Sequence, residues 1–151
     1  MRGFIRRKWF SMRILAIDYG ERHLGLAITD ELGILSQALP PIRRSSLEED
    51  LAALETLTKD REVGEIVIGL PRRMDDSLGP AAERVAGFAK ALKEHLGAPV
   101  HLVDERLSSA YAHRLMTEAG VPTPRKRLKE HGFAAQIILR TFLARRKAQR
   151  P

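Results

Sequence analysis

The chain has 151 residues, 44% of them hydrophobic, 30% charged and 5% aromatic, which suits one domain with an aliphatic core. The absence of cysteine excludes disulfides and thiolate metal sites. No apolar run reaches the roughly 18 residues of a membrane span, and the N-terminus lacks the apolar stretch of a signal peptide. We therefore expect a cytoplasmic protein.

The net charge of +7 is unevenly spread, because residues 1–11 carry four cations and no acid. A second methionine, Met12, opens the first apolar run directly. We expect a basic N-terminal extension over 1–11, either an extended gene start or a disordered basic arm. One domain would follow over 12–147, with a short basic tail over 148–151.

Three strands are predicted at the start of the domain. Apolar runs predict strands over about 12–18 and 24–30. Residues 31–33 are typical of a hairpin turn into a third strand over about 34–39, which Pro40-Pro41 would end. Three strands in immediate succession indicate an antiparallel meander.

Helices and strands alternate along the rest of the chain. Apolar residues at helical spacing, β-branched runs and breaker residues predict the remaining elements. These are helices over about 47–60, 82–96, 108–119 and 130–147, strands over about 65–71 and 100–103, and a loop over 120–126. The order βββαβαβαα predicts the α/β class, with a single mixed five-stranded sheet flanked by helices. The fourth and fifth strands should lie parallel to the first.

Two carboxylates stand at the ends of predicted parallel strands. Asp18 ends the first strand, and Glu105 follows the fifth. Functional groups gather at the carboxyl ends of such strands, so the two acids could share a cation. Divalent ions such as Mg²⁺ prefer oxygen ligands, and a pair of them can activate water against a phosphodiester. Two alternatives remain: Asp18 could shape a turn or pair with an arginine, and Glu105 could form a surface ion pair with Arg106.

The opening pattern, Asp18-x-Gly20 followed by Gly25-x-Ala27, also occurs in ATPases of the sugar-kinase, actin and Hsp70 type. Those proteins close a second domain over the nucleotide. A chain of 151 residues is too short to hold that second domain, so size excludes this class.

Five segments together resemble the successive motifs of the YqgF (RuvX) family, with matching order and spacing from about residue 12 to 144. They are Ile17-Asp18-Tyr19-Gly20, Leu24-Gly25-Leu26-Ala27, Ile68-Gly69-Leu70-Pro71, Asp104-Glu105-Arg106-Leu107-Ser108 and Ala134-Ala135-Gln136-Ile137-Ile138-Leu139. The resemblance implies an RNase H-like (ribonuclease H-like) fold related to Holliday-junction resolvases. It also implies a bacterial cytoplasmic nuclease that processes the 5′ end of precursor 16S ribosomal RNA.

Carried over by position, the resemblance makes Asp18 the first metal-binding acid and Glu105 the second. Where the family has its third acid, this chain has His131. A neutral imidazole can bind a metal, favouring Mn²⁺ over Mg²⁺, or act as a general base. We therefore expect Asp18, Glu105 and His131 to form the catalytic metal site. The alternative is that His131 is a core-edge histidine in a weakened enzyme.

Clusters of cations favour a polyanionic partner, and guanidinium groups pair with phosphate in a bidentate way. The predicted nucleic-acid contacts are Arg22, Arg72, Arg73, Arg106, Arg125, Lys126 and Arg127. The leading hypothesis is an endonuclease that depends on Mg²⁺ or Mn²⁺ and acts on precursor 16S rRNA. The alternatives are a nuclease for Holliday junctions or other structured or single-stranded DNA, and a nucleic-acid-binding module that has lost cleavage. A monomer and a homodimer are both compatible with the sequence.

Overall fold

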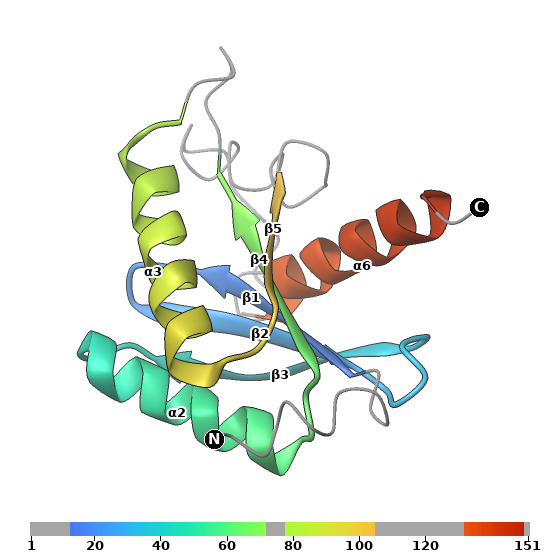
Figure 1. Ribbon diagram of the computed structural model, residues 1–151, viewed down its shortest axis with the longest axis horizontal. Coiled ribbons are helices and arrows are strands. Elements are labelled where there is room, and N and C mark those ends of the chain that lie inside the picture. Colours follow the sequence, from blue (N-terminus) through green and yellow to red (C-terminus); the bar gives the residue numbers. More distant parts are fainter. Residues whose placement is uncertain (1–12, 72–77, 105–131, 150–151) are drawn as a thin grey trace.

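The computed structural model describes residues 13–71, 78–104 and 132–149. Five strands form one sheet in the order β3-β2-β1-β4-β5 (Figure 1). Their bounds are β1 (Ile14–Tyr19), β2 (His23–Thr29), β3 (Ser36–Arg43), β4 (Glu65–Leu70) and β5 (Val100–Asp104). β1, β2 and β3 pair antiparallel, whereas β4 runs parallel to β1 and to β5. The predicted mixed sheet, with a meander on one side and parallel strands on the other, is confirmed.

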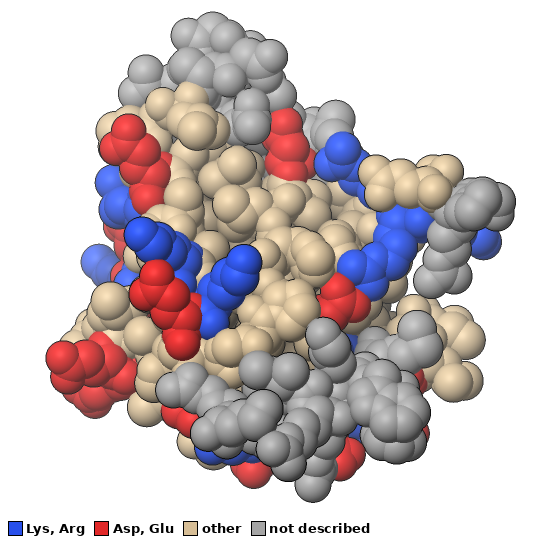
Figure 2. Space-filling model, in the orientation of Figure 1, with Lys and Arg blue, Asp and Glu red and all other residues tan. Residues whose placement is uncertain are grey.

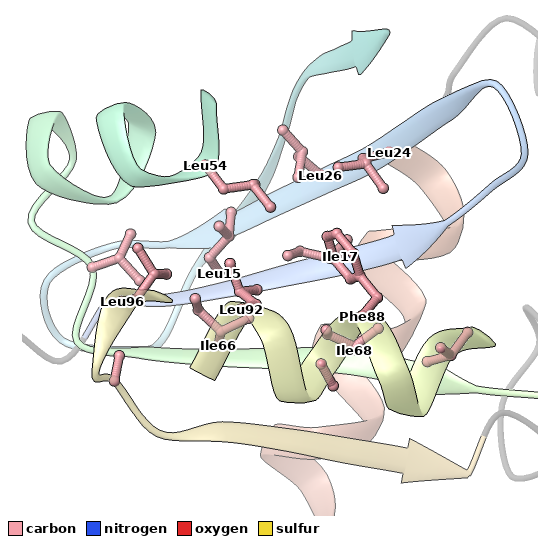
Figure 3. Packing of buried hydrophobic residues seen from close by; sticks show 14 of the residues in the cluster. Leu15, Ile17, Leu24, Leu26, Leu54, Ile66, Ile68, Phe88, Leu92 and Leu96 are labelled. Carbon is pink, nitrogen blue, oxygen red and sulfur yellow. The ribbon is translucent and has the colours of Figure 1, made fainter. Parts of the chain in front are cut away.

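Helices cover both faces of the sheet. The helices α2 (Leu47–Asp60) and α3 (Pro80–Leu96) lie on one face, and α6 (Gly132–Ala148) crosses the other (Figure 1). Leu54 of α2 and Phe88 and Leu92 of α3 pack on strand residues in the first core (Figure 3). The second core, beneath α6, is smaller and consists of aliphatic side chains. The sheet is therefore buried on both faces, as the continuous apolar runs predict.

Local signals define the ends of the two helices on the first face. Ser46 caps α2, since its hydroxyl accepts the backbone N–H of Glu49 at 3.1 Å. α3 begins at Pro80, two residues before the predicted start, because proline suits the first position of a helix. It ends at Leu96, and Gly97 caps it in the left-handed conformation with a φ of 71°.

The prediction for the third strand was wrong at both ends. β3 begins at Ser36 rather than 34, because the Asp30 carboxylate accepts the backbone N–H of Ile34 at 2.8 Å and holds the loop. It then continues through Pro40-Pro41 to Arg43. β3 is an edge strand, and its register against β2 shifts between Leu24 and Leu26, which accommodates residues without an N–H donor.

The last helix agrees with the prediction to within two residues at its start. Its buried residues are Gly132, Ala135, Ile138 and Leu139, while Phe142 packs at the margin of the core. The helix predicted over 108–119 and the loop predicted over 120–126 lie outside the described residues. No helix in the described ranges is long and apolar enough to cross a membrane.

Candidate metal and nucleic-acid site

Asp18 lies near the end of β1, on the face of the sheet that α6 covers. Side chains alternate along a strand, and Ile14 and Ala16 belong to the core beneath α6. Leu15 and Ile17 belong to the opposite core. Asp18 therefore continues the α6 side, where it is half-buried. An acid at this point interrupts the apolar face just where the strand reaches the edge of the sheet.

The carboxyl ends of the three parallel strands meet at this edge. Ile17 of β1 is in register with Ile68 of β4, and Leu70 at the end of β4 is in register with Asp104 at the end of β5. Asp18 and Asp104 thus end strands on either side of β4. Glu105 follows Asp104 in the sequence, and it lies outside the described residues. The register places Asp18 and Asp104 at one edge of the sheet, and the role of Glu105 stays a prediction.

The start of α6 lies against β2 and β3, and β2 pairs with β1, the strand that carries Asp18. A Cβ built on Gly132 would lie 2.4 Å from the Cβ of Ala38 and 2.9 Å from the carbonyl oxygen of Leu26. Leu26 pairs with Ile17, the residue before Asp18. Only glycine permits this close approach of helix and sheet. His131 immediately precedes Gly132 in the sequence and lies outside the described residues.

The turn from β1 to β2 is tight and is supported by Arg44. The backbone N–H of Gly20 donates to the carbonyl oxygen of His23 at 3.1 Å, and a Cβ on Gly20 would lie 2.6 Å from that oxygen. The Nη1 of Arg44 donates to the carbonyl oxygen of Gly20 at 3.0 Å. Arg22 is exposed in this turn, and its carbonyl oxygen accepts the backbone N–H of Arg44 at 2.8 Å. The structure thus brings Arg22 to the same edge as Asp18.

The other predicted nucleic-acid contacts fall outside the described ranges. They are Arg72, Arg73, Arg106, Arg125, Lys126 and Arg127. On the described part of the surface, basic side chains gather along α6, on the right of Figure 2. Arg140, Arg145 and Lys147 are exposed there. A cationic strip of this kind favours a polyanion.

A side-chain cluster holds the C-terminal half of α6 on the sheet. Arg146 donates to both carboxylate oxygens of Glu65, at 2.7 and 2.8 Å, and His101 Nε2 lies 2.8 Å from the same carboxylate. The Arg146 guanidinium also lies 4.4 Å from the ring centroid of Phe142. Hydrogen bonds from Arg146, and less strongly from His101, lower the pKa of Glu65 although its burial opposes the shift. The cluster fixes where α6 lies relative to β4 and β5.

Within the described ranges, no group of three His, Cys, Asp or Glu side chains could hold a metal ion. Asp18 is the one described member of the predicted set. It has the donor chemistry that a hard divalent ion prefers, a half-buried carboxylate near the end of a strand. The sequence supplies a further carboxylate and an imidazole directly after β5 and directly before α6.

Two arginines at this edge were missed by the sequence reasoning. Arg44 precedes α2, and Arg84 lies on α3 within two turns of its start. They line one cleft with the β1–β2 turn. Nothing in their sequence context distinguishes them from other surface arginines, because only the folded sheet brings the two segments together.

The sheet order and the helices on both faces define an RNase H-like fold. RuvC of Thermus thermophilus has a similar structure, with a TM-score of 0.53 over 90% of this chain and 97% of that chain at 16% identity. T. thermophilus RuvC in complex with a Holliday junction substrate is equally similar, with a TM-score of 0.54 over 92% of this chain and 98% of that chain at 14% identity.

The sequence comparisons identify the family within this fold. The model of the RuvX family, described as Holliday junction resolvase, matches residues 12–145, so the chain belongs to the RuvX family. A "Putative pre-16S rRNA nuclease" of Moorella thermoacetica is 45% identical over 89% of this chain and 96% of that protein. A protein of the same name from Symbiobacterium thermophilum is 44% identical over 93% of this chain and 97% of its own length. The resemblance drawn from the five motifs is thereby confirmed.

Proposed function

We propose that this protein is a metal-dependent endonuclease of the cytoplasm that acts in 5′-end processing of precursor 16S rRNA. The observation that carries the proposal is Asp18, a half-buried acid at the carboxyl end of the central strand, on the face that α6 covers. Relatives 44 and 45% identical over nearly their whole length bear the name of a pre-16S rRNA nuclease, which supports this substrate.

Asp18, Glu105 and His131 are the residues that would hold the metal. Two carboxylates and one imidazole suit a divalent first-row ion or Mg²⁺, and the imidazole favours Mn²⁺. When bound, the ion makes a water molecule more acidic and offsets the negative charge that develops at the phosphorus centre. Cleavage by water would leave a 5′-phosphate and a 3′-hydroxyl.

The protein's other contribution is to hold and orient the nucleic acid. Arg22 is exposed beside the Asp18 turn, where a guanidinium can pair with a backbone phosphate. The strip Arg140, Arg145 and Lys147 on α6 would attract a longer stretch of backbone. The predicted nucleic-acid contacts that lie outside the described residues keep that role in this proposal. They are Arg72, Arg73, Arg106, Arg125, Lys126 and Arg127.

A branched DNA is the second candidate substrate. The description of the matching family as Holliday junction resolvase favours it, and RuvC has been solved with such a junction. A module that binds without cleaving is the third candidate, because His131 stands where the family has an acid.

Cleavage assays on three substrates test the proposal. The purified protein is incubated with RNA carrying the 5′ leader of 16S rRNA, a four-way DNA junction or single-stranded DNA, each with Mg²⁺ or Mn²⁺. Asp18→Asn is expected to reduce RNA cleavage on the order of 100-fold or more, because it removes a charged ligand at the reacting centre. Asp60→Asn, the same change at an exposed position at the end of α2, is the control and should retain full activity.

Each outcome assigns a function. Equal cleavage by wild type and Asp18→Asn would overturn the site, and preferred cleavage of the junction would establish the DNA alternative. Binding without cleavage in either metal would favour the binding module. In the same assay, His131→Asp should raise the Mg²⁺-supported rate relative to the Mn²⁺-supported rate if His131 is a ligand.

A further inference from the structure

A cleft of about 330 Å³ opens at the same edge as Asp18. We name it the arginine cleft; its lining residues are Tyr19, Gly20, Glu21, Arg44, Pro71, Ala81, Arg84 and Val85. Tyr19 packs against Phe88 of α3, with ring centroids 4.9 Å apart, so the cleft faces the α3 side of the sheet. Asp18 and the arginine cleft therefore lie on opposite sides of the end of β1.

Arg44 is held rigidly in the wall of the arginine cleft. Its Nε donates to Asp50 at 3.2 Å, its Nη1 donates to the Gly20 carbonyl oxygen at 3.0 Å, and its guanidinium lies 4.3 Å from the ring centroid of Tyr19. Asp50 is only 1% exposed and also accepts the backbone N–H of Ser45 at 3.1 Å. Nη2 of Arg44 donates to no described protein atom. A fixed guanidinium with unused donors is well suited to bind an anion at little entropic cost.

Arg84 contributes a second positive charge from α3. It is exposed, and no acid in the described ranges pairs with it. α3 begins at Pro80 without a side-chain cap, and Ala81 of its first turn lines the arginine cleft, so the positive end of the helix lies at this cleft. Two acids oppose these arginines: Asp50 pairs with Arg44, and Glu21 is exposed among the lining residues. The arginine cleft therefore offers an anion the charge of Arg84 and the unused Nη2 donor of Arg44.

We propose that the arginine cleft binds a backbone phosphate of the nucleic acid, across β1 from Asp18. This inference rests on the proposed function, because it assumes that the polyanion is the substrate of the Asp18 site. The phosphate would be held between the fixed Arg44 and the exposed side chain of Arg84. A nucleic-acid strand cleaved at Asp18 would thereby be bound on both sides of the end of β1. These two contacts would set the direction in which the nucleic acid crosses the site.

Nucleic-acid binding, measured apart from cleavage, tests the arginine cleft. Fluorescence anisotropy follows labelled leader RNA with protein carrying Asp18→Asn, at a series of salt concentrations. Adding Arg84→Ala should raise Kd about 3- to 10-fold and reduce the slope of log K against log salt by about one. Lys90→Ala, which removes an exposed cation further along α3, should change neither by as much. Arg84→Lys should restore most of the slope, because it restores the charge.

Equal effects of Arg84→Ala and Lys90→Ala would overturn the proposal. It would also be overturned if inorganic phosphate raised the Tm in an Arg84-dependent way while RNA binding stayed insensitive to Arg84, since the cleft would then take a small anion. The nuclease assignment is judged separately. If wild type binds RNA through Arg84 and never cleaves it, the arginine cleft stands and the nuclease proposal falls.

Discussion

Gly132 is the residue on which the start of α6 depends. Its missing side chain lets the helix approach β2 and β3 so closely that a Cβ would overlap Ala38 and contact the carbonyl oxygen of Leu26. Neither neighbour is a flexible side chain that could swing away. The same glycine immediately follows His131 in the sequence, so it is the described residue next to that member of the proposed site.

Gly132→Ala should destabilise the fold by about 1–3 kcal/mol, because the helix start must move away from the sheet. The matched control is Gly87→Ala on α3, where a new Cβ has no atom within 4 Å. The control should stabilise by roughly 0.5–1 kcal/mol, as expected for replacing glycine inside a helix. Urea unfolding of both variants measures the difference. Two variants of equal stability would contradict the close approach.

At the scale of an element, α6 is positioned by a polar cluster at one end and close packing at the other. Glu65, at the start of β4, binds Arg146 and His101. At the other end of the helix, Gly132 packs on β2 and β3 on the same face of the sheet. Between these points Ala135, Ile138 and Leu139 fill the smaller core. Because the cationic strip Arg140, Arg145 and Lys147 also lies on α6, the Glu65 cluster helps to set where that strip lies on the sheet.

Glu65→Gln should lower the free energy of unfolding by about 1–2 kcal/mol at pH 7, since it replaces a partly buried bidentate ion pair. The pKa of Glu65 is lowered in the folded state, so this contribution is complete above the ordinary value of 4.5 and is lost as the pH falls through the lower, folded value. The difference in the free energy of unfolding between wild type and Glu65→Gln should therefore become smaller at acidic pH.

Urea unfolding at pH 7 and at several values below 4.5 follows that difference. Glu94→Gln, at an exposed position of α3, is the control and should stay within about 0.5 kcal/mol of wild type. A difference that stayed constant down to pH 3 would show that Glu65 contributes through packing rather than charge.

At the scale of the whole molecule, the fold rests on two hydrophobic cores rather than on the metal site. The larger core joins the sheet to α2 and α3, and the smaller one joins it to α6. Asp18 sits at the rim of the smaller core, near the end of β1. A metal bound there would serve the reaction while the cores hold the structure, in contrast to small domains whose folding energy comes from the metal.

Chelation by EDTA should therefore abolish cleavage while lowering Tm by at most a few degrees, on the order of the ligand-binding contribution alone. Calorimetry and the cleavage assay on the same samples measure the two effects. Asp18→Asn should show no metal-dependent change of Tm. Unfolding of the wild type in EDTA at room temperature would contradict this division between core and site.

The sequence alone determined the order and type of the described elements, because hydrophobic period and cap residues are local properties. It also placed Asp18 at the end of a buried strand, since an acid directly after Ile14–Ile17 can be recognised from the local sequence. The family motifs supplied the fold and the candidate set Asp18, Glu105 and His131. The family was confirmed, and the site remains a proposal.

Tertiary structure decided what depends on segments that lie far apart in the chain. Pairing with β2 at the sheet edge let β3 run through Pro40-Pro41, which local rules read as a stop. The side chains of β1 alternate between the two cores, and this alternation determined the face of the sheet on which Asp18 lies. Arg44 and Arg84 came together only because the turn after β1, the start of α2 and the start of α3 share one edge. Long-range packing, not local preference, sets those positions.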